Sequence, residues 1–128
     1  MAQSNGETVL VVEDEKPVRD LILRMLQSLG YSALPAGSGA EAIEISQRFS
    51  GPITLLLTDI VMPEMSGFQV ADTLLRLRPG LKVLYLSGYT EHAVVSHGPG
   101  PGVDFLAKPF TRETLSRKLT EIMGGGAQ

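Results

Sequence analysis

The sequence predicts an α/β domain with a doubly wound, five-stranded parallel sheet and helices on both of its faces. Short apolar runs rich in Val, Ile and Leu alternate with helix patterns along the whole chain. Strands that are apolar throughout are typical of a parallel sheet that helices bury on both sides. The chain has 128 residues, an ordinary length for one compact domain. We therefore expect a single domain over residues 8–123, with flexible ends at 1–7 and 124–128.

The first strand and the first helix show this pattern most clearly. Residues 8–12 are mostly apolar and β-branched, and Pro17 then stands where the first turn of a helix tolerates proline. An apolar stripe at spacings of three and four residues follows, and Gly30 ends the helix. The stripe consists of Val18, Leu21, Ile22, Met25, Leu26 and Leu29.

The same unit then repeats along the chain. The remaining strands are expected at 31–34, 53–57, 81–86 and 103–107. The remaining helices are expected at 38–49, 68–75, 90–96 and 111–123, with Ser38, Thr90 and Thr111 as N-caps. A run of glycine and proline at 98–102 cannot continue a helix.

The composition excludes several classes of protein. A net charge of −3 argues against a nucleic-acid surface, which needs clustered Lys and Arg. There is no cysteine, so disulfides, thiol catalysis and thiolate metal sites are excluded. No apolar run approaches the roughly 20 residues of a membrane span, and no signal-peptide pattern or glycine-rich nucleotide motif is present. We expect a cytoplasmic domain without membrane contact.

Polar residues stand at the carboxyl ends of four of the five predicted strands. They are Glu13 and Asp14, Asp59, Ser87, and Lys108. Ligands of open α/β sheets bind outside these ends, at the point where the strand order reverses. In the order 2-1-3-4-5 the first and third strands are neighbours at that point. We therefore expect the carboxylates of Asp14 and Asp59 to converge.

This set of side chains favours one kind of chemistry. Carboxylates about 4 Å apart repel by on the order of 4 kcal/mol per pair at an effective dielectric near 20. A hard divalent cation relieves that repulsion, and oxygen ligands suit Mg²⁺. A carboxylate nucleophile beside a cation, a hydroxyl and an ammonium group is an arrangement for phosphoryl transfer.

Four segments resemble the receiver domains of response regulators in order and spacing, over roughly residues 8 to 123. They are 11–15 (VVEDE), 57–67 (LTDIVMPEMSG), 86–88 (LSG) and 107–110 (AKPF). The resemblance implies the flavodoxin-like version of the doubly wound fold. It also implies that Asp59 is the phosphoacceptor, and that Mg²⁺ is bound by Asp14, Asp59 and the backbone carbonyl of Val61, with Glu13 acting through water.

The same resemblance implies roles for three residues beyond the metal site. Ser87 stands at the position of the switch hydroxyl that receives the phosphoryl group. Lys108, followed by a cis Pro109, would contact another phosphoryl oxygen. Phe105 takes the position of the switch aromatic, although packing in the core explains an aromatic on a buried strand equally well.

The resemblance also implies partners. A histidine kinase or a histidine phosphotransfer domain would donate the phosphoryl group, and the domain would be a monomer or a weak dimer. Four further segments resemble the receiver at the carboxyl end of hybrid sensor histidine kinases: 7–10 (ETVL), 51–53 (GPI), 78–83 (RPGLKV) and 87–90 (SGYT). A free-standing single-domain receiver is the alternative.

The resemblance also implies that the isolated domain would promote its own phosphorylation without being a conventional enzyme. In receivers the positions of Val61 and Tyr89 influence the approach of hydrolytic water. Neither residue is an acid or an amide here, so we expect slow loss of the phosphoryl group.

Two features depart from the family pattern. Glu13 replaces the more usual aspartate, and its extra methylene changes how a metal-bound water would be held. The run at 98–102 replaces a compact turn and alters the surface through which many receivers dimerise.

Simpler interpretations exist for each residue. The acids after the first strand could simply cap the first helix, because acids favour a helix N-terminus. Asp59 could be an ordinary loop aspartate, and Ser87 could merely begin a turn. His92 and His97 have no third ligand nearby and are expected to be exposed to solvent. An aspartyl-phosphate phosphohydrolase would need a second aspartate at the position of Val61. A phosphorylation-independent interaction module on the same fold is the main alternative function.

Overall fold

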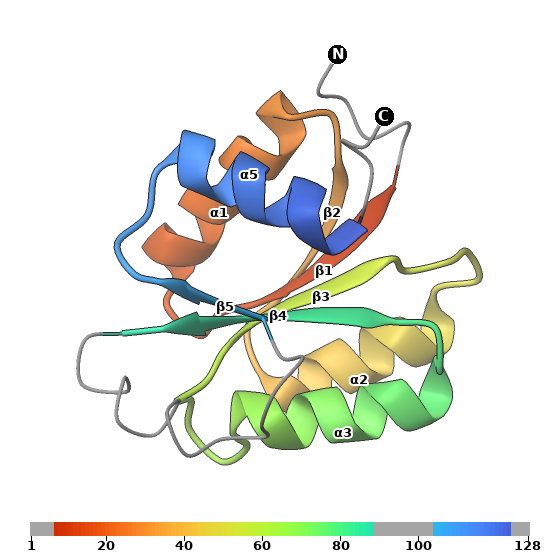
Figure 1. The fold of residues 1–128 in the computed structure, drawn as a ribbon. Helices are drawn as coiled ribbons and strands as arrows, with labels where there is room; N and C mark the ends of the chain where they lie inside the picture. Colours follow the sequence, from red (N-terminus) through yellow and green to blue (C-terminus); the bar gives the residue numbers. More distant parts are fainter. Residues whose placement is uncertain (1–6, 89–103, 124–128) are drawn as a thin grey trace.

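The computed structural model describes residues 7–88 and 104–123, and Figure 1 shows its fold. Five parallel strands form one sheet in the order β2-β1-β3-β4-β5, which confirms the predicted topology. The strands are β1 (Thr8–Val12), β2 (Ser32–Ala36), β3 (Leu55–Asp59), β4 (Lys82–Ser87) and β5 (Asp104–Ala107). The helices are α1 (Lys16–Ser28), α2 (Gly39–Arg48), α3 (Gly67–Leu77) and α5 (Arg112–Met123). The helix expected at 90–96, the run at 98–102, His92, His97 and Tyr89 lie outside the described residues.

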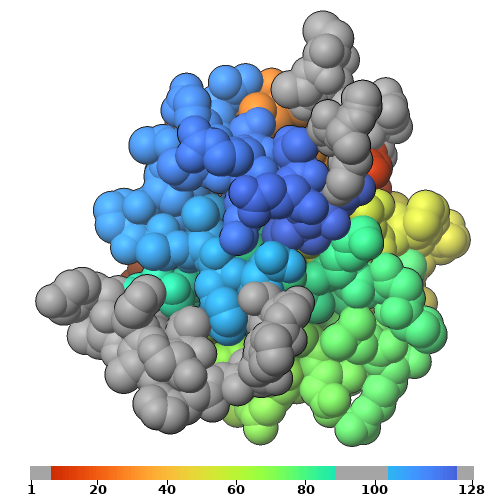
Figure 2. Space-filling model, viewed as in Figure 1, coloured from red at the N-terminus to blue at the C-terminus, as the bar shows by residue number. Residues whose placement is uncertain are grey.

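Helices cover the sheet on both faces. Helices α1 and α5 lie on one face and α2 and α3 on the other (Figure 1). In the space-filling view the side chains of α5 lie above the β5 edge and those of α3 lie below it (Figure 2). Strand β1 serves both layers, because Val9 and Val11 pack toward α1 and α5 whereas Leu10 and Val12 pack toward α2 and α3. The alternation of side chains along a strand therefore explains why β1 is apolar at every position from 9 to 12.

The strand register brings the carboxyl ends of β1, β3, β4 and β5 to one edge of the sheet. Val12 pairs with Thr58, Asp59 pairs with Leu86, and Ser87 pairs with Ala107. The residues that follow these positions therefore meet at one edge, as expected for a doubly wound sheet.

Strand β2 differs from its expected position at 31–34. It begins at Ser32 and continues through Pro35 to Ala36, and Pro35 lies opposite Val11. Strand β2 is at the edge of the sheet, where a residue without an N–H donor is tolerated. Tyr31 belongs to the core beside the strand rather than to the strand itself.

The helix ends follow the sequence signals. Gly30 has a φ of 93° after the end of α1, a conformation that glycine adopts without strain. The Ser38 hydroxyl accepts a hydrogen bond from the Glu41 amide at 3.1 Å, and the Thr111 hydroxyl accepts one from the Thr114 amide at 3.1 Å. The predicted N-caps of α2 and α5 are thereby confirmed. No helix within 7–88 or 104–123 is both long and apolar enough to cross a membrane.

Candidate functional site: an acidic cluster beside a lysine

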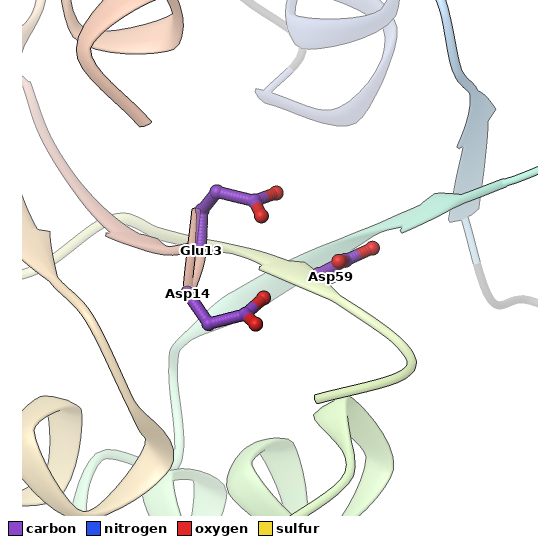
Figure 3. A group of neighbouring side chains, drawn as sticks. All are labelled: Glu13, Asp14 and Asp59. Carbon is purple, nitrogen blue, oxygen red and sulfur yellow. The ribbon is translucent and has the colours of Figure 1, made fainter. Parts of the chain in front are cut away.

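Three acidic side chains meet where β1 and β3 end. Each of Glu13, Asp14 and Asp59 offers a carboxylate oxygen, and these oxygens lie within 4.8 Å of one another. Figure 3 shows Glu13 and Asp14, from the loop after β1, extending toward the side where Asp59 lies at the end of β3, with the Glu13 side chain above that of Asp14 in this view. Asp14 is exposed, whereas Glu13 is fully buried and Asp59 is 6% exposed. The convergence expected from the strand order is therefore present.

The loop after β1 holds Glu13 through its backbone and its side chain. The Glu13 amide donates to the carbonyl oxygen of Ala36 at 3.1 Å, which continues the β1–β2 pairing by one residue. The Glu13 Oε2 atom accepts a hydrogen bond from the Glu15 amide at 3.2 Å. Burial, followed by repulsion from Asp59, raises the pKa of the Glu13 carboxyl above 4.5. The pocket therefore disfavours the state in which Glu13 and Asp59 are both ionised without a neighbouring positive charge.

Asp59 is the last residue of β3 and its backbone is tightly enclosed. The Thr58 hydroxyl donates to the Asp59 carbonyl oxygen at 3.0 Å. The following loop returns so that the Gly67 amide donates to the Ile60 carbonyl oxygen at 2.8 Å. A β-carbon on Gly67 would fall on the Asp59 carbonyl oxygen. Glycine at 67 therefore allows α3 to begin directly against the residue that carries the central carboxylate.

Lys108 supplies a positive charge to this cluster. Its Nζ atom lies 3.2 Å from Asp59 Oδ1 and 3.4 Å from Glu13 Oε1. Its backbone amide donates to the Ser87 carbonyl oxygen at 2.8 Å, and the bond to Pro109 is cis, as expected. Burial alone would lower the pKa of Lys108, but attraction by Asp59 and Glu13 outweighs it, so the pKa is raised above 10.5.

The two residues expected to form the switch lie on β4 and β5. Ser87 ends β4 and is buried, one position beyond the residue that pairs with Asp59. Phe105 is half-buried, and its ring stacks on Tyr85 at a centroid distance of 5.5 Å. The Tyr85 ring also packs edge-to-face with the ring of Phe68 on α3, at a centroid distance of 4.8 Å. Core packing therefore accounts for the position of Phe105, and its switch role stays a prediction.

Val61 and an apolar groove lie beside the acidic cluster. Val61 follows Asp59 by two residues and is 56% exposed. A groove of about 420 Å³ runs between α1 and the chain after β5. It is lined by Glu15, Val18, Leu21, Ile22, Met25, Gly88, Lys108, Pro109 and Phe110. Lys108 thus lines the groove and also contacts the acidic cluster.

The acidic cluster fits a hard divalent cation. Its donor atoms are all oxygens, which suit Mg²⁺ better than the softer transition metals. Two carboxylates are buried beside a single lysine, and an added cation would offset their repulsion. Asp14 and Asp59 can therefore hold such an ion. Two further contacts with the metal stay predictions: one with the backbone carbonyl of Val61, and one with Glu13 through a water molecule.

Arg19 is a functional candidate that no sequence pattern singled out. The Arg19 guanidinium donates from Nη1 to the Glu13 carbonyl oxygen at 2.7 Å. A backbone acceptor leaves no signature in the residue types, so only the three-dimensional structure shows this contact. Gly67 stood in a recognisable loop, but its packing against Asp59 depends on the path of the chain.

The fold and this cluster define a class of protein. A family model of the response regulator receiver domain matches residues 9–120. The chain therefore belongs to the response-regulator receiver family of two-component signalling systems.

Individual relatives include both large and small proteins. The chain is 39% identical over 121 residues to the sensor kinase CckA of Brucella abortus, covering 94% of this chain and only 13% of that protein. It is 32% identical over 116 residues to the response regulator receiver protein CpdR of the same organism, covering 90% of this chain and 95% of that protein.

Solved structures agree with this family. The crystal structure of the receiver domain from the hybrid histidine kinase CckA superposes with a TM-score of 0.69 at 32% identity, covering 91% of this chain and 98% of that one. A response regulator receiver protein from Sinorhizobium medicae superposes with a TM-score of 0.80 at 28% identity, covering 93% and 95% of the two chains.

Proposed function

We propose that this domain accepts a phosphoryl group from a phosphohistidine onto Asp59 with the help of Mg²⁺. An Asp59 carboxylate oxygen attacks phosphorus, the bond between phosphorus and the imidazole nitrogen breaks, and the imidazole leaves with the bonding pair. The product is an acyl phosphate on Asp59. The observation that carries the proposal is the Lys108 Nζ atom at 3.2 Å from Asp59 Oδ1, within a cluster of three carboxylates.

Each neighbouring residue has a task in this reaction. Bound Mg²⁺ would neutralise charge on the phosphoryl oxygens, and Asp14 and Asp59 would hold it. Lys108 already points its ammonium group at the acceptor oxygen, so it can stabilise a second phosphoryl oxygen without a large rearrangement. Glu13 holds Lys108 from the other side.

The conformational response we propose runs through Ser87. A phosphoryl group adds about −1.5 to −2 charges and strong acceptor oxygens. Ser87 ends β4, which pairs directly with β3, and it follows the residue that pairs with Asp59. Movement of Ser87 toward the new oxygens would change the surface beyond β4, with Phe105 as a second participant.

The donor we propose is a histidine kinase or a histidine phosphotransfer domain. We propose that such a donor contacts the groove beside Lys108, since Lys108 lines the groove and also contacts the acceptor Asp59. Leu21 is 51% exposed in the groove, which suits an apolar side chain of the donor. The similarity to CckA favours a hybrid kinase as the parent protein, and we propose that context for this chain.

The contact with the donor can be tested separately from the chemistry. Leu21→Glu should slow phosphorylation by a histidine phosphotransfer protein that phosphorylates the wild type. It should leave labelling by acetyl phosphate unchanged, because a small donor does not need the groove. Equal slowing with both donors, or none with either, would contradict the groove as the contact surface.

Acetyl phosphate with Mg²⁺ tests the proposal itself. Intact mass spectrometry should show the gain of one phosphoryl group on the wild type. Asp59→Asn, or removal of Mg²⁺ by EDTA, should abolish the gain. A folded wild-type domain that gains no mass would instead support the phosphorylation-independent interaction module.

A further inference from the structure

Arg19 connects helix α1 to the loop that carries two of the acidic residues. Its side chain is half-buried, and its Nη1 atom donates to the Glu13 carbonyl oxygen at 2.7 Å. That oxygen belongs to the peptide unit between Glu13 and Asp14. A hydrogen bond to this peptide unit restrains the rotation that would turn both carboxylates away from Asp59.

The loop after β2 shapes the space in which the guanidinium lies. A β-carbon on Gly37 would lie 3.2 Å from Arg19 Nη1 and 3.4 Å from Glu41 Oε1. The Glu41 Oε1 atom accepts a hydrogen bond from the Gly37 amide at 2.6 Å. The guanidinium therefore lies close to the bare backbone of Gly37, on the side of the loop where Glu41 also lies. The absence of a side chain at Gly37 therefore leaves room for the arginine.

Asp14 depends on this contact more than Glu13 does. The Glu13 carboxylate has its own partners in Lys108 and the Glu15 amide. Asp14 is exposed, so the surrounding core does not fix its direction. The peptide unit that precedes Asp14 therefore restrains where its carboxylate points, and Arg19 donates a hydrogen bond to that unit.

From these contacts we infer that Arg19 is a positioning residue for the metal site, acting through the Glu13–Asp14 peptide unit. The inference rests on the proposed function, because it assumes that Asp14 and Asp59 bind Mg²⁺. Groups that hold metal ligands in place typically affect metal affinity by about 10 to 100-fold. A purely structural hydrogen bond would instead change the stability of the fold and leave the affinity of the folded domain unchanged.

Calorimetric titration of MgCl₂ into the intact domain separates these roles. Arg19→Met removes the donor and the charge, and we expect Mg²⁺ to bind about 10-fold more weakly. Arg19→Lys keeps a cationic donor, and we expect a loss of no more than about 3-fold, since lysine forms fewer hydrogen bonds than arginine. Arg24→Met, at an exposed arginine of the same helix, is the matched control and should bind Mg²⁺ like the wild type.

Labelling with acetyl phosphate gives a second readout. A positioning defect should raise the Mg²⁺ concentration needed for half-maximal labelling by the same factor as the dissociation constant. Saturating Mg²⁺ should then bring the labelling rate of Arg19→Met to within a few fold of the wild-type rate. Arg19→Gln, whose amide is too short to reach the same carbonyl, replaces Arg19→Met if the latter does not fold.

The outcomes are distinct. A folded Arg19→Met or Arg19→Gln domain with wild-type Mg²⁺ affinity would overturn the inference. So would an equal loss of affinity in Arg24→Met. A wild-type domain that binds no Mg²⁺ would instead contradict the proposed function, on which this inference depends.

Discussion

Glu13 shows how one extra methylene changes the acidic cluster. Its Oε1 atom lies 3.4 Å from Lys108 Nζ, and its Oε2 atom accepts from the Glu15 amide. The sequence predicted only a water-mediated contact with the metal. The pairing with Lys108 could not be predicted, because it depends on how far the side chain extends across the pocket between β1 and β5.

The raised pKa of Glu13 gives a pH dependence with a definite sign. Between pH 4.5 and its folded pKa, the folded state binds more protons than the unfolded state. The free energy of unfolding therefore falls as pH rises through this window. We expect urea unfolding in EDTA to show this fall in the wild type and a smaller one in Glu13→Gln. Parallel pH profiles for the two proteins would contradict the pKa shift.

Val61 bears on how long the phosphoryl group would persist. An exposed aliphatic side chain two residues after Asp59 cannot orient a water for attack on an acyl phosphate. We expect Val61→Asn to shorten the half-life of the phosphorylated domain by about 10-fold or more, measured as loss of the added mass. Leu77→Asn, at an aliphatic residue of α3 that is 46% exposed, should leave the half-life unchanged. Rapid loss of the phosphoryl group from the wild type would contradict this account.

At the scale of elements, the start of α3 determines how closely that helix approaches Asp59. A methyl group on Gly67 must displace either the helix or the Asp59 backbone. We expect Gly67→Ala to lower the free energy of unfolding by about 1 to 3 kcal/mol, as overpacking does, and to slow labelling by acetyl phosphate.

Gly80 provides the control for this prediction. A β-carbon there would meet no atom within 4 Å, so Gly80→Ala should change neither quantity appreciably. A Gly67→Ala domain as stable and as readily labelled as Gly80→Ala would show that α3 can retreat without cost.

Tertiary packing determines where strands and helices begin and end, and local sequence patterns predicted these positions only approximately. The sequence predicted β3 from 53, whereas the strand begins at Leu55. The capping box that Ser66 forms with Gln69 at the start of α3 was not predicted either. A serine in a loop followed by a glutamine three residues later is a known capping pattern, so this signal was present and could have been used.

At the scale of the whole molecule, apolar periodicity predicted the alternation of strands and helices. The polar ends of four strands then predicted the site, because a parallel sheet brings those ends together. Hydrogen bonds between a side chain and a backbone carbonyl far away in the sequence could not be predicted, because no pattern of residue types marks them. Arg78, for example, donates hydrogen bonds to the carbonyl oxygens of Ser46, Phe49 and Gly51 and so ties the end of α3 to the end of α2.

The arrangement of the molecule also explains why one residue is central. Asp59 ends the middle strand of the sheet, between the strand that leads to Glu13 and Asp14 and the strand that ends in Ser87. Lys108 approaches it from beyond β5. Asp59 and Glu13 both lie within reach of Asp14 and of the lysine, but Asp59 alone of the three acids ends a strand of the sheet.

Mapping the phosphorylated residue tests this account most directly. After labelling with acetyl phosphate and Mg²⁺, borohydride reduces an acyl phosphate to an alcohol, which mass spectrometry of peptides can locate. Reduction at Asp59, lost when EDTA replaces Mg²⁺, is the result we predict. Reduction at Glu13 or Asp14 with Asp59 unchanged, or no reduction in a folded domain, would contradict the account.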